Sequence, residues 1–164
     1  MLFLVRAFDK FADKRARLTI AGGGSLLAQG VTHDSRGVRL TGGNELPSGR
    51  SLLLEQMPPN IHVIGKVDRS DLPALFAETD VLIVPSLCYE NSPTVIFEAF
   101  SYGVPVLASR VEGVAELIKE GDNGLTFETG NEQSLFKKIL WCLEHHNELN
   151  EMSKKTVQSL VGLS

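Results

Sequence analysis

The sequence predicts an α/β fold in which helices cover both faces of a doubly wound parallel sheet. Three observations predict it: short apolar runs recur along the 164 residues, segments with helical patterns separate them, and the runs are continuously apolar rather than alternating. Continuous apolar strands are expected where both faces of a sheet are covered, whereas one solvated face gives alternation. Strands that alternate with helices are typical of doubly wound sheets.

Each expected element follows from its local pattern, and the chain length suits one domain, residues 1–164. The expected strands are RLTIA (17–21), IHVIG (61–65), DVLIVPS (80–86), PVLAS (105–109) and NGLTF (123–127). Helices are expected over residues 3–13, 70–78, 93–102 and 112–119, with a C-terminal pair from about residue 132 onward. This order predicts a Rossmann-like sheet.

Residues 25–60 depart from the alternation and are expected to form an irregular insertion or an extended crossover. The stretch is glycine-rich and too long for a tight connection. A helix is expected over 48–57, ended by Pro58 and Pro59. The segment GVTHDSRGVRLTG fits either a loop or a small hairpin.

Composition and charge exclude several classes of protein. The net charge is −4 and lysine and arginine do not cluster, which argues against electrostatic binding to nucleic acid. Cys88 and Cys142 fit neither a metal-ligand spacing nor a disulfide framework. The apolar start is interrupted at Arg6, too early for a signal peptide or a membrane span. A cytoplasmic protein without a bound metal or cofactor is therefore expected.

The stretch CYENSPTVIFEAFSYGVPV places one carboxylate in a loop and another inside an apolar helix. Ser92 and Pro93 have the character of an N-cap and a first helical residue. Gly103 is expected to end the helix. Because this helix is apolar nearly all round, it should be largely buried, with Glu98 as its only charge.

The positions of the two acids suggest a ligand with hydroxyls on both sides of a phosphate. Glu90 follows a strand and therefore lies at the carboxyl end of the sheet, where open α/β folds bind ligands. The free amides of the helix's first turn form an anion site. Glu98 lies about 7 Å further along the helix axis. A nucleotide sugar, with its sugar, diphosphate and ribose, matches this order.

The segment SLCYENSPTVIFEAFSYGVPVLASRVEGVAELIKEGDNGLTF resembles the donor-binding signature of group 1 (family 4) glycosyltransferases, which have the two-domain GT-B fold. The family pattern is two glutamates separated by seven residues, then Glu-Ala, Gly-x-Pro-Val, a glycine turn with Glu, and Asn-Gly. It falls at Glu90, Glu98, Ala99, Gly103, Pro105, Val106, Gly113, Glu116, Asn123 and Gly124. The resemblance runs from about residue 4 to 132 and is most specific over 80–127.

The resemblance implies roles in binding a nucleoside diphosphate sugar for the two glutamates and for six further residues. The catalytic Glu90 would contact hydroxyls of the transferred sugar and hold charge near the reacting carbon, and Glu98 would bind the ribose hydroxyls. Amides of the loop and of the first helical turn would hold the diphosphate, and the turn after strand 61–65 would border the base. These residues are Asn91, Ser92, Thr94 and Val95 for the diphosphate, and Lys66 and Val67 for the base. The family needs no bound metal.

The chain departs from the family pattern in two places. Asn91-Ser92-Pro93 replaces a Gly-Phe-Gly type segment, and Glu112-Gly113 replaces two adjacent glycines. A carboxylate at position 112 would disfavour a nearby diphosphate.

The family's first, central strand, with its Gly-Arg end and the lysine that follows, has no counterpart here. The acceptor-binding domain is also missing from the pattern. The chain is thus expected to be a truncated donor-binding domain, inactive alone, and any contact with a membrane surface is expected to run through the missing domain.

The resemblance implies that the parent protein is a retaining glycosyltransferase, and two further functions stay open. One is a nucleotide-sugar binding module without catalysis, and the other is a sugar-nucleotide epimerase of the same fold, against which the glutamate pair argues. Glu98 also has a structural alternative, as a carboxylate that caps a neighbouring loop. Glu116 is expected to be structural, since an acid is favoured in the first turn of a helix.

Overall fold

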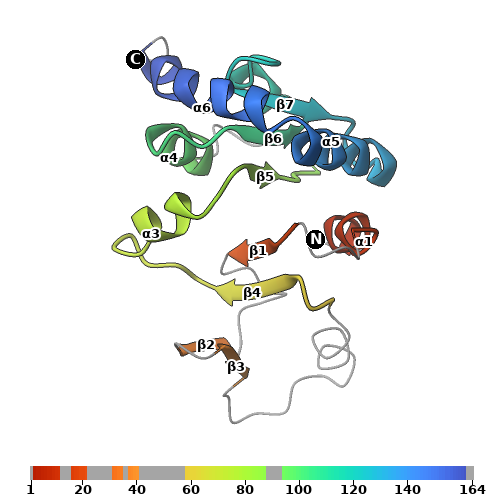
Figure 1. Ribbon diagram of the computed structural model, residues 1–164, viewed down its shortest axis with the longest axis vertical. Helices are drawn as coiled ribbons and strands as arrows, with labels where there is room; N and C mark the ends of the chain where they lie inside the picture. The colour runs from red at the N-terminus through yellow and green to blue at the C-terminus, as the bar shows by residue number, and fades with distance from the viewer. Residues whose placement is uncertain are drawn as a thin grey trace. The chain divides into compact units, whose positions relative to one another are not determined.

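The computed structural model describes residues 2–11, 16–21, 31–34, 37–40, 58–87 and 94–161. The chain divides into two compact units: unit 1 comprises Met1–Lys10 and Pro73–Ser164, and unit 2 comprises Phe11–Leu72. Parallel strands alternate with helices, so the predicted α/β class is confirmed (Figure 1). No helix among the described residues is both long and apolar enough to cross a membrane.

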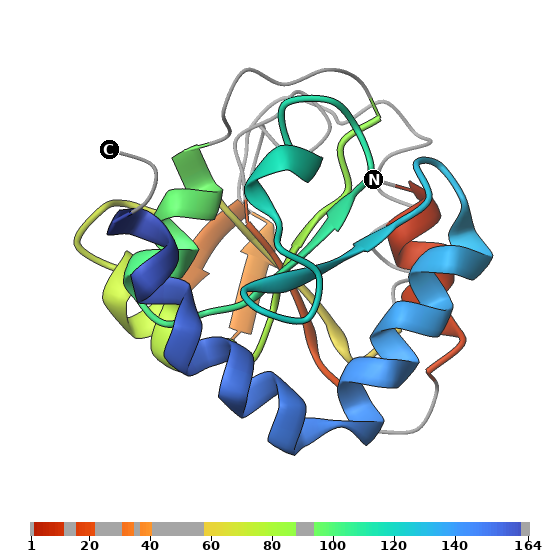
Figure 2. The same ribbon diagram turned by 90° about the horizontal axis from the view of Figure 1, so that it is seen from above.

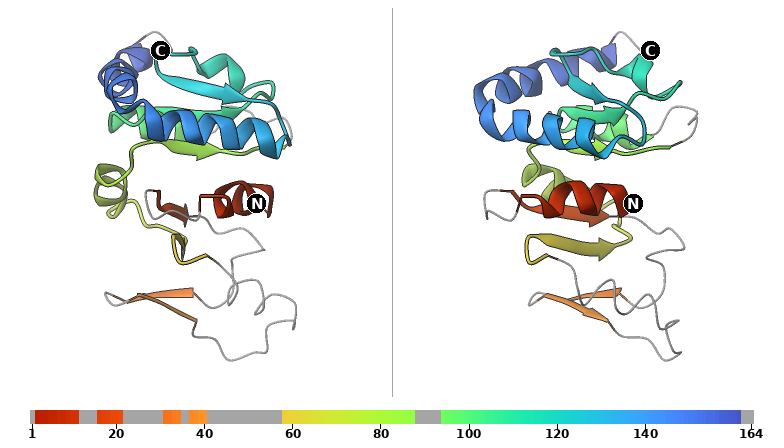
Figure 3. Two further views of the ribbon diagram at one scale, coloured as in Figure 1. Left: turned by 45° about the vertical axis from the view of Figure 1, so that its right-hand side comes forward. Right: turned by 90° about the vertical axis from the view of Figure 1, so that its right-hand side faces the viewer.

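Unit 2 contains a parallel pair of strands and a hairpin. Strand β1 (Leu18–Ala21) pairs with β4 (Ile61–Gly65), and both lie at the sequences predicted for them. Strands β2 (Val31–Asp34) and β3 (Gly37–Leu40) pair in antiparallel fashion (Figure 3), so of the two alternatives for this segment the hairpin is found. The helix predicted over 48–57 lies outside the described residues.

The two strands of the parallel pair are not buried on both faces as predicted. Leu18 and Ile20 on β1 and Ile61 and Val63 on β4 are buried, while the residues between them, such as Thr19 and His62, are exposed. Side chains alternate across a strand, and the second face here carries exposed Thr19, Ala21 and His62 and half-buried Ile64, so only the first face is fully covered. The prediction of continuous burial was wrong for this pair.

Unit 1 is built on a three-stranded parallel sheet in the order β5–β6–β7. Its strands are β5 (Leu82–Val84), β6 (Val106–Ser109) and β7 (Gly124–Phe127). Every residue of β6 and β7 is buried, as the continuous apolar pattern predicts. The helices are α1 (Leu2–Asp9), α3 (Leu72–Ala77), α4 (Thr94–Ser101), α5 (Glu132–Glu144) and α6 (His146–Val161).

Helix α1 packs against α5, as Figure 2 shows. Leu4, Ala7 and Phe8 recur at the spacing of one helical face and are buried. Beyond the helix, Lys10 Nζ forms an ion pair with Glu132 Oε1 at 2.7 Å and lies 5.7 Å from the centre of the Phe136 ring. The N-terminal segment is therefore a helix, as predicted, and not a strand of the sheet.

The helix predicted over 112–119 is only a short 3-10 helix, η1 (Ala115–Leu117). The side chain of Asn123 explains why it does not continue. Its Nδ2 donates to the Leu117 carbonyl at 3.1 Å, and its Oδ1 accepts from the Lys119 amide at 2.8 Å. These are groups that a longer helix would pair with its own backbone, so the chain turns toward β7 instead.

The predicted absence of a central strand concerns the neighbours of β1 and β5 in the sheet. Among the described strands, β1 pairs with β4 alone and β5 pairs with β6 alone. No described strand pairs with both β1 and β5. Each of these two strands therefore has one edge without a described backbone partner.

Candidate functional site

Helix α4 carries Glu98 and ends as the sequence predicts. Gly103 adopts a left-handed conformation with φ +77°, which glycine accepts without strain. The Val104 amide donates to the Ala99 carbonyl at 2.9 Å, and the Gly103 amide donates to the Phe100 carbonyl at 3.1 Å. These two bonds form a Schellman motif. Ser153 on α6 also donates to the Gly103 carbonyl at 2.5 Å, which fixes this end of the helix.

Burial on α4 is one-sided rather than complete, which corrects the prediction of a helix buried nearly all round. Ile96, Ala99 and Phe100 face the core and are fully buried. Thr94 is exposed and Glu98 is half-buried. Residues four apart lie on the same face of a helix, so Thr94 and Glu98 share the side turned away from the core. The helix therefore presents its one carboxylate beside its N-terminus, about 6 Å along the axis.

The carboxylate of Glu98 makes no hydrogen bond or ion pair with any residue in the described part of the chain. The backbone carbonyl of Glu98, by contrast, accepts from Ser101 Oγ at 2.7 Å and from the Tyr102 amide at 3.3 Å. A carboxylate that capped a neighbouring loop would show such a bond. The described residues thus give no support to the structural alternative for Glu98.

The predicted site residues are described to different degrees. Thr94 is exposed and Val95 is half-buried at the start of α4 in unit 1. Lys66 is exposed and Val67 half-buried directly after β4, in unit 2. Glu90, Asn91 and Ser92 lie outside the described residues.

The turn after β6 contains the second departure from the family pattern. Gly113 has φ +83°, so this glycine permits a turn that other residues rarely adopt. Glu112 before it is exposed. Glu116 is exposed in η1 and contacts no described residue through its carboxylate. The Glu116 carboxylate thus has no bond to the described residues, and its predicted structural role stays a prediction.

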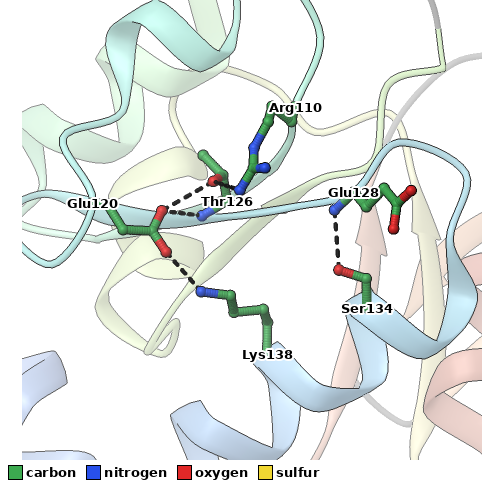
Figure 4. A network of polar contacts seen from close by, with 6 residues as sticks. All are labelled: Arg110, Glu120, Thr126, Glu128, Ser134 and Lys138. Carbon is green, nitrogen blue, oxygen red and sulfur yellow. Dashed lines mark hydrogen bonds and ion pairs between the residues drawn. The ribbon is translucent and has the colours of Figure 1, made fainter.

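A polar network joins β7 to α5 and to the end of β6 (Figure 4). Glu120 Oε2 accepts from the Thr126 amide at 2.7 Å and from Thr126 Oγ1 at 3.0 Å, while Lys138 Nζ donates to Glu120 Oε1 at 2.6 Å. Arg110 Nη2 donates to Thr126 Oγ1 at 3.2 Å. Burial alone would raise the pKa of Glu120, but the hydrogen bonds from Lys138 and Thr126 outweigh it and lower that pKa.

Sequence reasoning missed the two polar side chains that close the carboxyl end of β6, Ser109 and Arg110. Ser109 is completely buried, and its hydroxyl contacts carbonyls at the end of β5. The signal that could have identified it is a serine at the end of an apolar strand, because a hydroxyl buried there needs a hydrogen-bond partner.

Neither a reactive cysteine nor a cluster of metal ligands is found among the described residues. Burial raises the pKa of the Cys142 thiol to about 11, so this cysteine is a packing residue of α5 rather than a nucleophile. Within the ranges that the structure describes, no three His, Cys, Asp or Glu side chains gather as a metal site would require.

The fold is similar to that of solved glycosyltransferases. A Rickettsia africae glycosyltransferase superposes with a TM-score of 0.73 at 19% identity, over 98% of this chain and 39% of that one. Anabaena HepE in complex with UDP gives 0.69 at 21% identity, over 95% of this chain and 38% of that one. The C-terminal domain of a Francisella tularensis group 1 glycosyltransferase gives 0.58 at 16% identity, over 70% and 60%. The chain has the fold of a C-terminal GT-B domain.

The family follows from the sequence match. A profile described as "Glycosyl transferases group 1" covers residues 1–145, and the chain belongs to that family. It is 36% identical over 84 residues to the O-antigen chain mannosyltransferase B of Escherichia coli, covering 51% of this chain and 21% of that protein. It is 29% identical over 111 residues to the N-acetyl-alpha-D-glucosaminyl L-malate synthase of Bacillus anthracis, covering 62% and 28%. The chain spans less than a third of the length of either relative.

Proposed function

We propose that this chain is the donor-binding part of a retaining glycosyltransferase that moves a sugar from a nucleoside diphosphate sugar to an acceptor. The observation that carries the proposal is the carboxylate of Glu98, which is half-buried on the side of α4 turned away from the core, one turn from the start of the helix, and contacts no described residue. Family membership supports it. So does the likeness in fold to Anabaena HepE, which has been solved with UDP and with UDP-glucose.

In the proposed chemistry the helix terminus binds the diphosphate, and two carboxylates bind the ribose and the transferred sugar. The first amides of a helix have no partner within the helix and favour an anion; at the start of α4 they include those of Thr94 and Val95, which would stabilise the departing diphosphate. Glu98 would accept hydrogen bonds from the ribose hydroxyls. Glu90 would hold the sugar by its hydroxyls and keep negative charge beside the carbon from which the diphosphate leaves.

The remaining assignments rest on the resemblance alone and stay predictions. They place Asn91 and Ser92 among the amides that bind the diphosphate, and Lys66 and Val67 at the border of the base. A carboxylate at position 112 opposes a diphosphate nearby, so the turn after β6 is assigned no phosphate contact.

Glu98→Gln tests the central assignment in the 164-residue chain. A neutral amide accepts hydrogen bonds from hydroxyls less strongly than a carboxylate, so the Kd for nucleoside diphosphates should rise about tenfold. Calorimetric titration with UDP, GDP and ADP measures it. Glu116→Gln is the matched control, since Glu116 is also a helical carboxylate without a described contact, and it should leave the Kd unchanged.

Glu90→Gln tests the division of roles. It should spare binding of the free diphosphate and weaken binding of the corresponding nucleotide sugar, because Glu90 is assigned to the sugar. Equal losses of free-diphosphate affinity in the Glu90 and Glu98 variants would contradict the division. Failure of the unchanged chain to bind any of the three diphosphates would contradict the proposed function itself.

A further inference from the structure

Asn123 is the only asparagine in the sequence that is followed by a glycine. Glycine has no Cβ and allows many backbone conformations, so in an open chain the Gly124 nitrogen readily reaches the asparagine side chain. That nitrogen can attack Cγ of Asn123, the bond from Cγ to Nδ2 then breaks, and ammonia leaves with the proton of the Gly124 amide. Water opens the resulting five-membered ring at either carbonyl, which leaves aspartate or isoaspartate. The pair therefore carries the chemistry of spontaneous deamidation.

The fold holds the side-chain amide of Asn123 away from this reaction. The side chain is completely buried. Its Nδ2 donates to the Leu117 carbonyl and to Ser159 Oγ, each at 3.1 Å, and its Oδ1 accepts from the Lys119 amide at 2.8 Å. Because these bonds are shielded from water, breaking them is costly. The side chain therefore cannot turn toward the Gly124 nitrogen while the fold is closed.

Ser159 is the partner of Asn123 that is most easily withdrawn. Leu117 and Lys119 lie six and four residues before Asn123, whereas Ser159 lies 36 residues away in the sequence. It belongs to the last turn of α6, and helix ends fray more readily than helix centres. Opening of this one turn removes the bond to Asn123 while the sheet stays paired.

We propose that Asn123 is a deamidation site that the folded unit 1 keeps intact, and that the bond to Ser159 is the first part of this closure to open. The folded state then protects Asn123 in proportion to the time that the chain spends closed. The proposal is independent of the ligand that unit 1 binds.

The reaction prevents the fold from closing again. An aspartate at position 123 has no N–H to donate to the Leu117 carbonyl, and it brings a charge into a buried position. Isoaspartate lengthens the backbone by one carbon directly before Gly124. There β6 lies so close that even a Cβ would overlap the Val106 carbonyl. Each long opening thus converts part of the protein irreversibly.

The first measurement compares the unchanged 164-residue chain in buffer and in denaturing urea, at pH 8 and 37 °C. Trypsin releases residues 120–137, which contain Asn123 and, as an internal reference, Asn131 followed by a glutamate. Mass spectrometry of this peptide follows the conversion of each asparagine. Asn123 should convert at least about tenfold more slowly in the folded chain than in urea. Equal rates of conversion in the two conditions would overturn the proposal.

Ser159→Ala tests the closure at α6. The loss of one hydrogen bond should speed the conversion of Asn123 in the folded chain about fivefold. Ser153→Ala is the matched control, because it removes another α6 hydroxyl, one that donates to the Gly103 carbonyl, and it should leave the rate nearly unchanged. Urea denaturation of both variants separates local opening from a loss of overall stability. No acceleration in Ser159→Ala, or equal acceleration in both variants at equal stability, would overturn the role of Ser159.

Asn123→Asp tests the consequence of the reaction, since it places the aspartate product in the chain from the start. Its urea midpoint should lie clearly below that of the unchanged chain. Asn147→Asp makes the same change at an exposed position in the first turn of α6, where an acid is favoured, and should not lower the midpoint. Equal midpoints of Asn123→Asp and the unchanged chain would show that the product still fits the fold, and would overturn the irreversible step.

Discussion

Asn123 and Gly124 show how single residues hold the C-terminal unit together. Asn123 is fully buried, and besides its bonds to Leu117 and Lys119 its Nδ2 donates to Ser159 Oγ on α6 at 3.1 Å. Gly124 begins β7 at a point where the backbone of β6 comes very close. A Cβ at position 124 would lie 2.1 Å from the Val106 carbonyl oxygen, much closer than a Cβ and a non-bonded oxygen can approach.

Gly124→Ala is therefore expected to lower the free energy of unfolding by about 3 kcal/mol or more, since β7 must move away from β6. Urea denaturation followed by circular dichroism measures it. Gly121→Ala is the control: position 121 has open space around it but a φ of +80°, so it should cost only about 1–2 kcal/mol. A larger loss in Gly121→Ala than in Gly124→Ala would show that the contact with Val106 does not matter.

The sequence draws attention to these residues but does not predict the contacts that they make in the fold. Asn123 and Gly124 stand out as an Asn-Gly pair within a recognisable pattern, yet their contacts involve Val106 and Ser159, which lie far away along the chain. Ser109 went unnoticed for the same reason, because its partner at Ser86 is 23 residues earlier. Long-range contacts of this kind leave no periodic signal in one sequence.

At the scale of elements, β7 shows how side chains satisfy backbone groups at the edge of this sheet. It has β6 on one side and no other described strand on the second. Glu120 lies along the second edge of β7. Its carboxylate accepts a hydrogen bond from the Thr126 amide, a group that a neighbouring strand would otherwise pair with. Lys138 on α5 holds the carboxylate in place, so a side-chain network takes over the role of a neighbouring strand.

The lowered pKa of Glu120 makes this network sensitive to acid. A carboxylate whose pKa is lower in the folded state stabilises the protein above its unfolded pKa, and this contribution is lost as the pH falls through the folded pKa. Glu120→Gln should therefore lower the urea midpoint clearly at pH 7 and much less near pH 3. Urea denaturation at both pH values measures the difference.

Glu151→Gln provides the comparison. Glu151 forms an exposed ion pair with Lys154 within α6, at 2.6 Å, and the hydrogen bond from Lys154 also lowers its pKa. Solvent screens such pairs, so the variant should change the midpoint little at either pH. If Glu120→Gln lowered the urea midpoint by the same amount at pH 7 and at pH 3, the stabilisation would not come from the ionised carboxylate of Glu120.

The sequence predicted the elements correctly where burial of apolar residues determines them. It predicted them wrongly where a side chain forms hydrogen bonds with the backbone groups of a helix. The five apolar runs all became strands, since each is a short segment that the fold buries at least on one face. The helix expected over 112–119 did not form, because Asn123 takes over the backbone groups that would continue it. The wrong burial pattern for β1 and β4 came from treating a run with Thr19 and His62 as uniformly apolar.

At the scale of the whole molecule, β1 and β5 each have one edge for which no partner strand is described. β1 and β5 each pair with one strand among those described, and unpaired backbone groups on an edge readily pair with another chain. The sequence predicts such edges because the family's first strand, which is the shared neighbour of both strands in the doubly wound order, has no counterpart in the pattern, and this stays a prediction.

We expect the 164-residue chain to self-associate through these edges. Size-exclusion chromatography with light scattering should show a mass above the 17.9 kDa of one chain, falling toward it on dilution. Thr19→Lys places a charge at an exposed position of β1 and should shift the equilibrium toward the monomer, because lysines on an edge strand oppose pairing. Gln158→Lys adds the same charge at an exposed position of α6 and should leave the mass unchanged. A chain that stays monomeric at every concentration, or equal effects of the two lysines, would contradict association through β1.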